Sequence, residues 1–318
     1  MISLQDVTKR YSDGTVAVDG LTLDVDEGVI CALVGPSGCG KTTTMRMINR
    51  LIEPSSGTIE VAGEEISSLD VQQLRRHIGY VIQNGGLFPH YTVRRNVATV
   101  CRLLRWDKQK TAQRVDEMLA LVDLDPATFG DRYPHQLSGG QRQRVGVARA
   151  LAADPPVLLM DEPFGAVDPI ARERLQDEFL ALHARVRKTV VLVTHDIDEA
   201  VKLGDRIAVM RQGGHLEQYD RPAVVLGFPR TDFVADFVGS DRAVKRLRVS
   251  PIPLAALGEQ TVERTPGVID VAADASLYDL LAAVLQSPAS LARITPGGQP
   301  VRVGDIDRLL AASRPDSP

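Results

Sequence analysis

The sequence contains few cysteines, few aromatic residues and no long apolar segment. Only three of its 318 residues are cysteine, at positions 31, 39 and 101, and aromatic residues make up 4%. The cysteine spacing fits neither a disulfide framework nor a zinc site. No run reaches about 18 consecutive apolar residues, and the first residues lack the charged-then-apolar layout of a signal peptide. We therefore expect a cytosolic chain that neither spans a membrane nor is exported.

An excess of positive charge is also missing. The chain has 37 Lys and Arg residues against 41 Asp and Glu, a formal net charge of −4. Nucleic-acid binders neutralise phosphates with a basic face, so this balance argues against such a partner. The composition, 44% hydrophobic and 25% charged, is that of a soluble globular protein. At about 150 residues per domain, the length predicts roughly two domains.

One stretch has the glycine and lysine spacing of a known binding motif. Residues 35–42 read Gly-Pro-Ser-Gly-Cys-Gly-Lys-Thr, the spacing of a phosphate-binding loop. An apolar run at 29–34 predicts a buried strand before the loop, and residues 43–51 have helical spacing after it. The N–H groups of such a loop and helix start attract an anion. This context disfavours the alternative, a glycine-rich turn that binds nothing.

The sequence therefore predicts a nucleoside triphosphate site. Lys41 would reach the β- and γ-phosphates, and the Thr42 hydroxyl would take Mg²⁺. Cys39 has no assigned task in this prediction and is interpreted as a tolerated spacer. The residues assigned to the nucleotide here are Gly35, Pro36, Ser37, Gly38, Cys39, Gly40, Lys41, Thr42 and Thr43.

Tyr11 lies close to a predicted turn near the N-terminus. Residues 2–9 and 15–26 alternate apolar and polar positions, which predicts two antiparallel strands, and Asp13-Gly14 turns the chain between them. Packing at a strand end is the ordinary explanation for such a tyrosine. A ring on which adenine stacks is the functional one, and this stretch alone leaves both open.

A helical insertion is predicted in the middle of the chain. A strand over 78–83 ends at Gln83, which could bind a ligand or merely satisfy a loop backbone group. A glycine- and proline-containing loop follows. Two helical patterns then cover 93–104 and 108–122 with no strand between them. Helices in succession indicate a subdomain inserted into an α/β core.

A second candidate anion site precedes the helix predicted at 142–152. Residues 137–141 read Leu-Ser-Gly-Gly-Gln and are called the LSGGQ segment below. Ser138 and Gln141 have the spacing of a capping box, which explains them structurally. The free N–H groups at Gly139 and Gly140, with the Ser138 hydroxyl, would also bind an anion.

Two further strands end in polar side chains. Residues 157–160 are apolar and lead to Asp161 and Glu162, which fit a metal-holding and a water-polarising carboxylate better than two solvated loop acids. The strand at 189–194 ends at His195, where a lone histidine is more often plain polar structure. Asp196 and Glu199 are spaced to cap the next helix, which argues against a metal cluster there.

Taken in order over roughly residues 1–240, these segments resemble the ATP-binding subunit of an ABC transporter. The resemblance rests on the phosphate loop, Gln83, the LSGGQ segment, the strand ending at Glu162, Asp168 and His195. It implies an α/β P-loop ATPase fold with an antiparallel β subdomain and a helical subdomain at about 84–152. Strands at 206–210 and 215–219, a short helix at 222–226 and the segment 233–238 would complete this domain near Gly239.

The resemblance also implies roles for single residues. Tyr11 would stack on adenine, Thr42 and Asp161 would serve Mg²⁺, and Gln83 would reach the metal and sense the membrane partner. Glu162 would polarise the attacking water, and His195 would contact the γ-phosphate. The remaining residues assigned to ATP are Ser138, Gly139, Gly140, Gln141 and Asp168.

The same resemblance implies partners. Ser138 and Gly140 would complete the ATP site of an opposite subunit, so that two identical chains enclose two ATP molecules head to tail. Integral-membrane permease subunits, and through them a solute-binding protein, would complete the transporter. The chain would then lie at the cytoplasmic face of the membrane.

Two stretches narrow the resemblance further. Residues 83–93 and 239–247 are similar to importers of quaternary-amine osmoprotectants such as glycine betaine, carnitine and choline. Importers of polyamines, sulfate or iron share the core motifs and remain an alternative. A soluble ABC ATPase that acts on nucleic acid or ribosomes is disfavoured, because the sequence has neither a second phosphate loop nor heptads.

The C-terminal part has its own pattern. Residues 241–263 are predicted to be a linker, and its basic run Arg242, Lys245, Arg246 and Arg248 is better explained as a solvated face than as a lipid contact. Residues 264–312 read strand, helix, strand, strand, helix, which resembles one CBS repeat. A single repeat would pair with that of another subunit or be only structural. Residues 313–318 are expected to be disordered.

Overall fold

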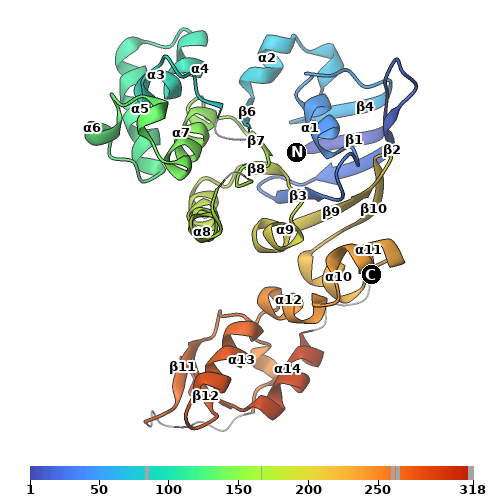
Figure 1. Cartoon of the computed structure of the whole chain (residues 1–318), viewed down its shortest axis with the longest axis vertical. Helices are drawn as coiled ribbons and strands as arrows, with labels where there is room; N and C mark the ends of the chain where they lie inside the picture. Colours follow the sequence, from blue (N-terminus) through green and yellow to red (C-terminus); the bar gives the residue numbers. More distant parts are fainter. Residues whose placement is uncertain (83–85, 166, 259–261, 263–265, 314–318) are drawn as a thin grey trace. The chain divides into compact units, whose positions relative to one another are not determined.

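The structure is a computed structural model that describes residues 1–82, 86–165, 167–258, 262 and 266–313 (Figure 1). The chain forms two compact units, Met1–Tyr219 and Asp220–Pro318. Each unit is described by itself below. The limits predicted from the sequence, 1–240 for the ATPase domain and 264–312 for the C-terminal repeat, stay predictions.

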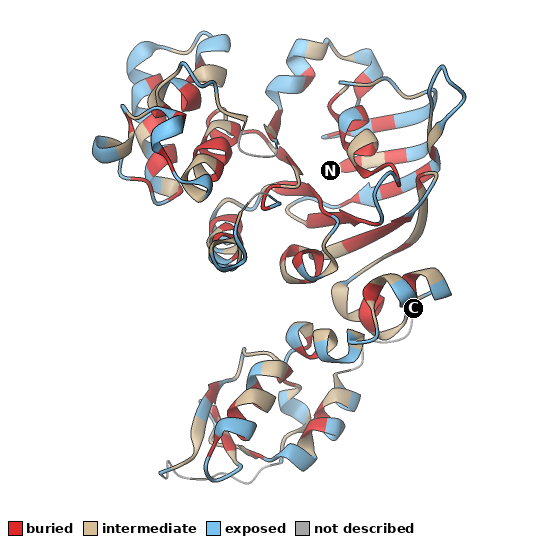
Figure 2. Cartoon of the chain, in the orientation of Figure 1, coloured by how far each residue is buried: buried red, intermediate tan, exposed pale blue. Residues whose placement is uncertain are grey.

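A six-stranded sheet is the centre of the first unit, in the order β10-β9-β3-β8-β7-β6. β3 pairs in parallel with β8 and β9, and β7 pairs in parallel with β6 and β8. Every residue of β3 and β8 is buried, as expected of strands covered on both faces (Figure 2). The strands are β3 (Ile30–Val34), β6 (Ile78–Val81), β7 (Val157–Asp161), β8 (Thr189–Val193), β9 (Arg206–Arg211) and β10 (His215–Asp220).

A second sheet in this unit is antiparallel, in the order β2-β1-β4-β5. The antiparallel pair predicted at the N-terminus is confirmed, with Leu4 of β1 opposite Leu23 of β2 and Ile59 of β4. These side chains share one buried core with Leu33 of β3 and Met45 of the helix α1 (Lys41–Ile48), so the sheet supports this helix. The strands are β1 (Ile2–Arg10), β2 (Val16–Val25), β4 (Ser56–Val61) and β5 (Glu64–Glu65).

A helical group follows β6 and lies at the opposite end of the core sheet from β10 (Figure 1). The single helix predicted at 93–104 is in fact two, divided at Ala98. The carboxamide of buried Asn96 donates to the carbonyls of Phe88, Tyr91 and Thr92 and so binds the preceding loop. The group comprises α3 (Val93–Val97), α4 (Thr99–Leu103), α5 (Lys108–Leu121), α6 (Pro126–Phe129) and α7 (Gly139–Leu151).

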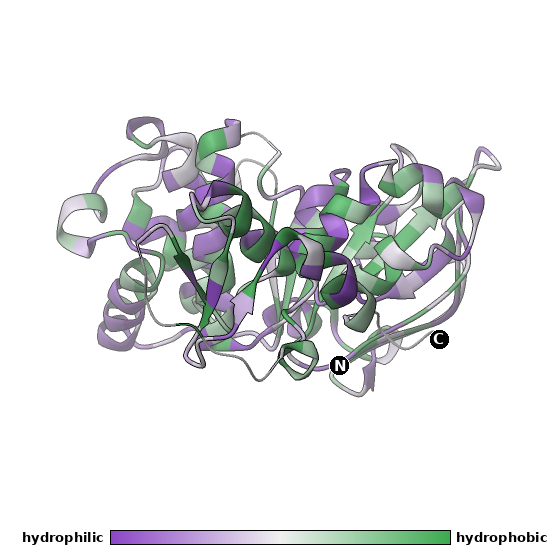
Figure 3. Cartoon of the chain, turned by 90° about the horizontal axis from the view of Figure 1, so that it is seen from below, coloured by the Kyte–Doolittle hydropathy of each residue, from purple (hydrophilic) through white to green (hydrophobic). Residues whose placement is uncertain are grey.

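The other helices of the first unit cover the sheets. Figure 3 shows hydrophobic and hydrophilic residues interspersed along the helices of the chain, as amphipathic helices require. The other helices of the first unit are α1 (Lys41–Ile48), α2 (Val71–Arg76), α8 (Pro169–Val186) and α9 (Ile197–Leu203), with 3₁₀ turns at Ile66–Ser68 and Pro134–Gln136. No helix in the described part of the chain has both the length and the apolar character needed to cross a bilayer.

The second unit has the element order predicted for its last fifty residues. β11 and β12 are parallel, β12 and β13 antiparallel, and the apolar faces of α13 and α14 share one core with this sheet. Part of the predicted linker forms α12, which buries Leu247. The elements are α10 (Pro222–Gly227), α11 (Asp232–Val238), α12 (Arg242–Val249), β11 (Ile269–Ala272), α13 (Leu277–Gln286), β12 (Ala292–Thr295), β13 (Pro300–Val301) and α14 (Ile306–Ala312), with 3₁₀ turns at Leu254–Ala256 and Val303–Asp305.

One capping prediction is wrong. Asp196 does cap α9, accepting from the N–H groups of Asp198 and Glu199 at 2.9 and 3.4 Å. The Glu199 side chain instead turns inward and is buried, where it accepts from Nε2 of Gln176 on α8 at 3.4 Å. Burial raises the pKa of Glu199, and hydrogen bonds from Thr194 and Gln176 only partly oppose that shift.

We expect the Glu199→Gln variant to be more stable than the wild type at pH 8, with a Tm higher by about 2–4 °C. A carboxyl whose pKa is raised by folding loses stability as pH rises through its unfolded and then its folded pKa. The amide removes the buried charge, so the difference should shrink at acidic pH, where wild-type Glu199 is protonated. Thermal unfolding of both proteins at pH 8 and at acidic pH tests this expectation. A lower Tm for the variant than for the wild type at pH 8 would contradict it.

Candidate active site

The phosphate loop joins β3 to α1 and needs glycine at two positions. Gly35 has φ of 150°, and a Cβ there would lie 2.2 Å from the Met210 carbonyl oxygen. Gly40 has φ of 98°, and its Cβ would lie 2.4 Å from the Ala17 carbonyl oxygen. A side chain at either position would push the loop off the strands beneath it. The exposed residues Pro36, Ser37 and Gly38 then form the rim of the loop.

Lys41 is held at this loop by backbone carbonyls. Its side chain is 6% exposed, and Nζ donates to the carbonyl oxygens of Gly35 at 2.7 Å and Pro36 at 3.0 Å. The Cys39 sulfur is 3.6 Å from the same nitrogen. Cys39 is fully buried in the core cluster, so its task is packing beneath the loop rather than spacing alone. The ammonium group is therefore positioned where an anion would meet the loop.

Thr42 and Asp161 come together from different elements. The Thr42 hydroxyl, in the first turn of α1, donates to Oδ1 of Asp161 at 3.3 Å. Burial at the end of β7 raises the pKa of Asp161, against the lowering effects of the Thr42 hydrogen bond and of nearby Arg46. A hydroxyl beside a carboxylate is an all-oxygen donor set, which fits a hard cation such as Mg²⁺.

Glu162 faces a different partner from Asp161. Its backbone leaves the strand with φ of 43°, and its N–H donates to the Val193 carbonyl at 3.0 Å. Its carboxylate Oε1 lies 3.3 Å from Nδ1 of His195, whose side chain is 61% exposed. The two neighbouring acids thus point to separate groups, Asp161 to Thr42 and Glu162 to His195.

The LSGGQ segment lies elsewhere in the chain. Ser138 caps α7 in a complete capping box: its hydroxyl accepts from the Gln141 N–H at 3.2 Å, and the Gln141 side chain accepts from the Ser138 N–H at 3.0 Å. Ser138, Gly139 and Gly140 line a cleft of about 580 Å³ together with Asp168. No residue of the phosphate loop is among the described residues that line this cleft.

Three other residues predicted for the site are Tyr11, Asp168 and Gln83. Tyr11 follows β1, is 38% exposed, and has the Lys9 ammonium 5.4 Å from its ring centre. Asp168 caps α8, and its Oδ1 accepts from the Ala171 N–H at 3.0 Å. Gln83 lies outside the described residues.

Arg46 is a site residue that the sequence analysis missed. Its positive charge lowers the pKa of Asp161 and that of Tyr80 on β6, in both cases against the larger raising effect of burial. No motif contains it, but it lies four residues after Thr42. On a helix this spacing places both side chains on one face, which is the signal that could have found it.

Comparison with known proteins identifies the family. The family model described as ABC transporter matches residues 18–165. The osmoprotectant import ATP-binding protein OsmV of Salmonella typhimurium is 56% identical over 251 residues, 78% of this chain and 65% of that protein. The glycine betaine/carnitine/choline transport ATP-binding protein OpuCA of Bacillus subtilis is 50% identical over 277 residues, 87% of this chain and 70% of that protein.

The chain belongs to the ABC transporter family of ATP-binding proteins. A solved structure similar to this ABC protein is a dimeric ATP-binding cassette in a post-hydrolysis state, bound to ADP and Pi. The two are 34% identical with a TM-score of 0.62, over 70% of this chain and 98% of that one. The ABC chain spans about two thirds of the length of the two curated relatives named above, 65% and 70%.

Proposed function

We propose that this chain is the ATP-hydrolysing subunit of an importer that takes up a quaternary-amine osmoprotectant. The observation that carries the ATPase part is the meeting of Lys41, Thr42, Asp161, Glu162 and His195 after the carboxyl ends of β3, β7 and β8. In open α/β sheets, ligands bind at this edge of the strands. Phosphoryl transfer to water requires a loop that holds the phosphates, an all-oxygen metal site and a carboxylate that orients the water. The phosphate loop, the pair Thr42 and Asp161, and Glu162 beside His195 match these three parts.

Mg²⁺ fits the pair formed by Thr42 Oγ1 and Asp161 Oδ1, because both atoms are hard oxygen donors at the loop that would hold the phosphates. When bound, the ion would neutralise charge on the β- and γ-phosphates. Lys41 adds a fixed positive charge beside them, since its ammonium is already held at the loop by two carbonyls.

The other two side chains act on water and on the γ-phosphate. Glu162 would accept a hydrogen bond from the attacking water and orient it in line with the phosphorus. His195 has Nδ1 directed at Glu162, which leaves Nε2 on the far side of the ring for a γ-phosphate oxygen. Tyr11, partly exposed at the end of β1, would supply the ring on which adenine stacks.

The LSGGQ segment supports a two-chain site. Its amides are at a helix start that favours an anion, yet the cleft beside it contains no phosphate-loop residue in the described part of the chain. A second copy placed head to tail would bring its own Lys41 to this segment. The similar solved structure named above is described as dimeric, which is consistent with this arrangement.

The solute and the membrane partners are inferred from the relatives. The names of the two relatives above specify osmoprotectant import and glycine betaine, carnitine or choline transport. A groove of about 450 Å³ next to Gln83 in the sequence, lined by Tyr80, Ile82, Phe88 and Val100 among others, offers a surface for a permease segment. A solute-binding protein would then act through the permease.

We also infer that residues 264–312 form one CBS-like repeat. The support is their order of strand, helix, two strands and helix, built around a single apolar core. Its pairing with the same repeat of another subunit would complete the two-repeat module that is typical of the family.

Glu162→Gln is expected to lower ATP turnover by about 10²–10⁴, the contribution of a positioned base, while ATP binding is retained. Steady-state phosphate release and binding of a fluorescent ATP analogue measure the two quantities. Glu64→Gln, the same change at an exposed position on β5, is the matched control. Wild-type turnover in the Glu162 variant would remove this residue from the proposed role.

Mixing Lys41→Ala chains with Ser138→Arg chains is expected to restore ATP hydrolysis that neither variant has alone. In the mixed dimer, the intact phosphate loop of the Ser138→Arg chain faces the intact LSGGQ segment of the Lys41→Ala chain. Phosphate release from the mixture is the readout, and light scattering reports whether dimers form. Dimers that form without recovering activity would refute the two-chain site.

The solute assignment predicts what co-purifies with the chain. A permease and a solute-binding protein should be recovered with it from its native membrane, and calorimetry should show that the binding protein takes quaternary amines. Spermidine and sulfate serve as the comparison ligands. Binding of either of them in preference to glycine betaine, carnitine and choline would reject the osmoprotectant assignment.

A further inference from the structure

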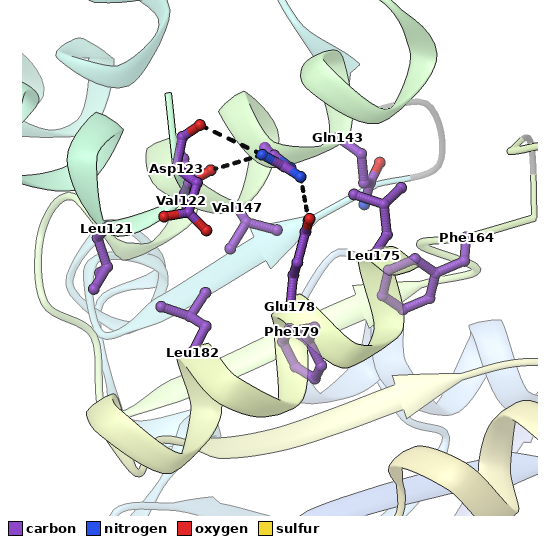
Figure 4. A pocket seen from close by; sticks show the side chains of 11 residues that line it. Leu121, Val122, Asp123, Gln143, Val147, Phe164, Leu175, Glu178, Phe179 and Leu182 are labelled. Atoms are coloured by element: carbon purple, nitrogen blue, oxygen red, sulfur yellow. Dashed lines mark hydrogen bonds and ion pairs between the residues drawn. The ribbon is translucent and has the colours of Figure 1, made fainter. Parts of the chain in front are cut away.

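An ion pair that the proposed function does not use connects α7 to α8 (Figure 4). Arg144 lies on α7, one helical turn after Gly140, and its guanidinium contacts the carboxylate of Glu178 on α8. Nη2 of Arg144 makes this ion pair. Its second terminal nitrogen, Nη1, lies 3.5 Å from the Val122 carbonyl oxygen and 3.4 Å from the Asp123 carbonyl oxygen, just past the end of α5. One side chain thus joins three elements.

The surroundings of this pair are mostly apolar. The Arg144 and Glu178 side chains are 19% and 25% exposed. They border a small cavity of about 40 Å³, which Figure 4 shows from close by. Solvent screens such a pair less than a surface pair, and removing one partner leaves the other charge partly buried. Seven apolar residues line the cavity: Leu121, Val122, Val147, Phe164, Leu175, Phe179 and Leu182.

Glu178 is held from a second direction. Its other oxygen, Oε1, accepts from Nε of Arg174, one turn earlier on α8, at 2.9 Å. The Arg174 side chain is 79% exposed, so this contact contributes little energy, and Arg144 is the less exposed of the two partners of the carboxylate. The guanidinium of Arg144 lies between this carboxylate and the two carbonyl oxygens.

The two helices joined by this pair begin at residues of the proposed ATP site. α7 begins after Ser138 and α8 begins after Asp168, and both residues line the cleft beside the LSGGQ segment, with Arg144 in its wall. A Cβ on Gly140 would be 3.2 Å from Cδ1 of Leu175, so the LSGGQ turn rests directly on α8.

The same region of α8 contacts the chain just after Glu162. The ring of Phe164 packs edge-on against that of Phe179, with centroids 6.3 Å apart. Phe179 is the neighbour of Glu178 in sequence. α8 therefore touches the segment behind the proposed base and, through Glu178, the helix that presents the LSGGQ amides.

We propose that the Arg144–Glu178 pair is a positioning device that sets the angle of α7 on α8 and so aims the LSGGQ segment at the nucleotide of a second chain. This inference rests on the two-chain ATP site proposed above. The pair acts through α7 and touches no reacting atom, so it is a positioning pair and not a catalytic one. Misplacement of a binding group by about 1 Å costs roughly 100-fold in rate, which is the scale on which such a pair matters.

Glu178→Gln should lower kcat for ATP hydrolysis by about 10- to 100-fold, while binding of a fluorescent ATP analogue by the phosphate loop changes by less than about threefold. Arg144→Lys should act in the same direction, because an ammonium cannot reach the carboxylate and both carbonyls at once. The matched control is Glu173→Gln, the same change at an exposed position on α8, which should leave both quantities unchanged. Wild-type kcat in Glu178→Gln would overturn the proposal.

A mixing experiment separates positioning from general damage. Glu178→Gln chains mixed with Lys41→Ala chains should recover hydrolysis, since the intact phosphate loop of the first then meets a correctly aimed LSGGQ segment on the second. A variant that damages its own phosphate loop or its whole fold cannot be rescued in this way. Thermal unfolding is recorded for each chain, and Arg144→Lys takes the place of Glu178→Gln in the mixture if the latter does not fold.

The mixture of Lys41→Ala with Ser138→Arg serves as the reference for interpretation. If that reference recovers activity and the Glu178→Gln mixture does not, the positioning role is refuted while the two-chain site stands. If neither recovers although mixed dimers are present, the two-chain site itself fails and the inference that rests on it fails too. Recovery in both mixtures, together with the loss of kcat in Glu178→Gln alone, supports the proposal.

Discussion

The parallel pairing of β8 with its two neighbours is the constraint on which the rest of this structure depends. Val193, the last residue of β8, lies opposite Leu33 on one side and Asp161 on the other. The ladder continues past the strand ends, because the Glu162 N–H donates to the Val193 carbonyl and the Thr194 N–H to the Leu33 carbonyl. A shift of this register by one residue would turn every buried side chain of β8 to the opposite face and separate the polar residues that follow.

Polar groups in this protein lie where backbone ladders and helices end. Lys41 is surrounded by loop carbonyls, Asp161 meets the Thr42 hydroxyl, and Ser138 closes a capping box. Each of these groups has a hydrogen-bonding partner within the chain. Between helices, the partly buried Arg144 and Glu178 are each other's counter-charge.

Much of the fold and of the site could be predicted from the sequence, because the signals are local. The apolar runs that became β3, β7 and β8 and the glycine spacing of residues 35–42 require only neighbouring residues to be interpreted. The predictions failed where a distant partner decides the outcome. Glu199 has the right spacing for a cap, but Gln176 on another helix accommodates its side chain in the interior. Likewise, nothing local marks Arg144 as different from the arginines around it.

By itself, the sequence determined the phosphate loop, most of the strands and helices and the identity of the acids at the strand ends. These follow from residue type and spacing, since glycine conformation, apolar periodicity and capping chemistry act over a few positions. Only the tertiary structure decided which side chains meet: Asp161 with Thr42, Glu162 with His195, and Arg144 with Glu178. Those contacts depend on strand register and helix packing, which bring together residues far apart in the chain.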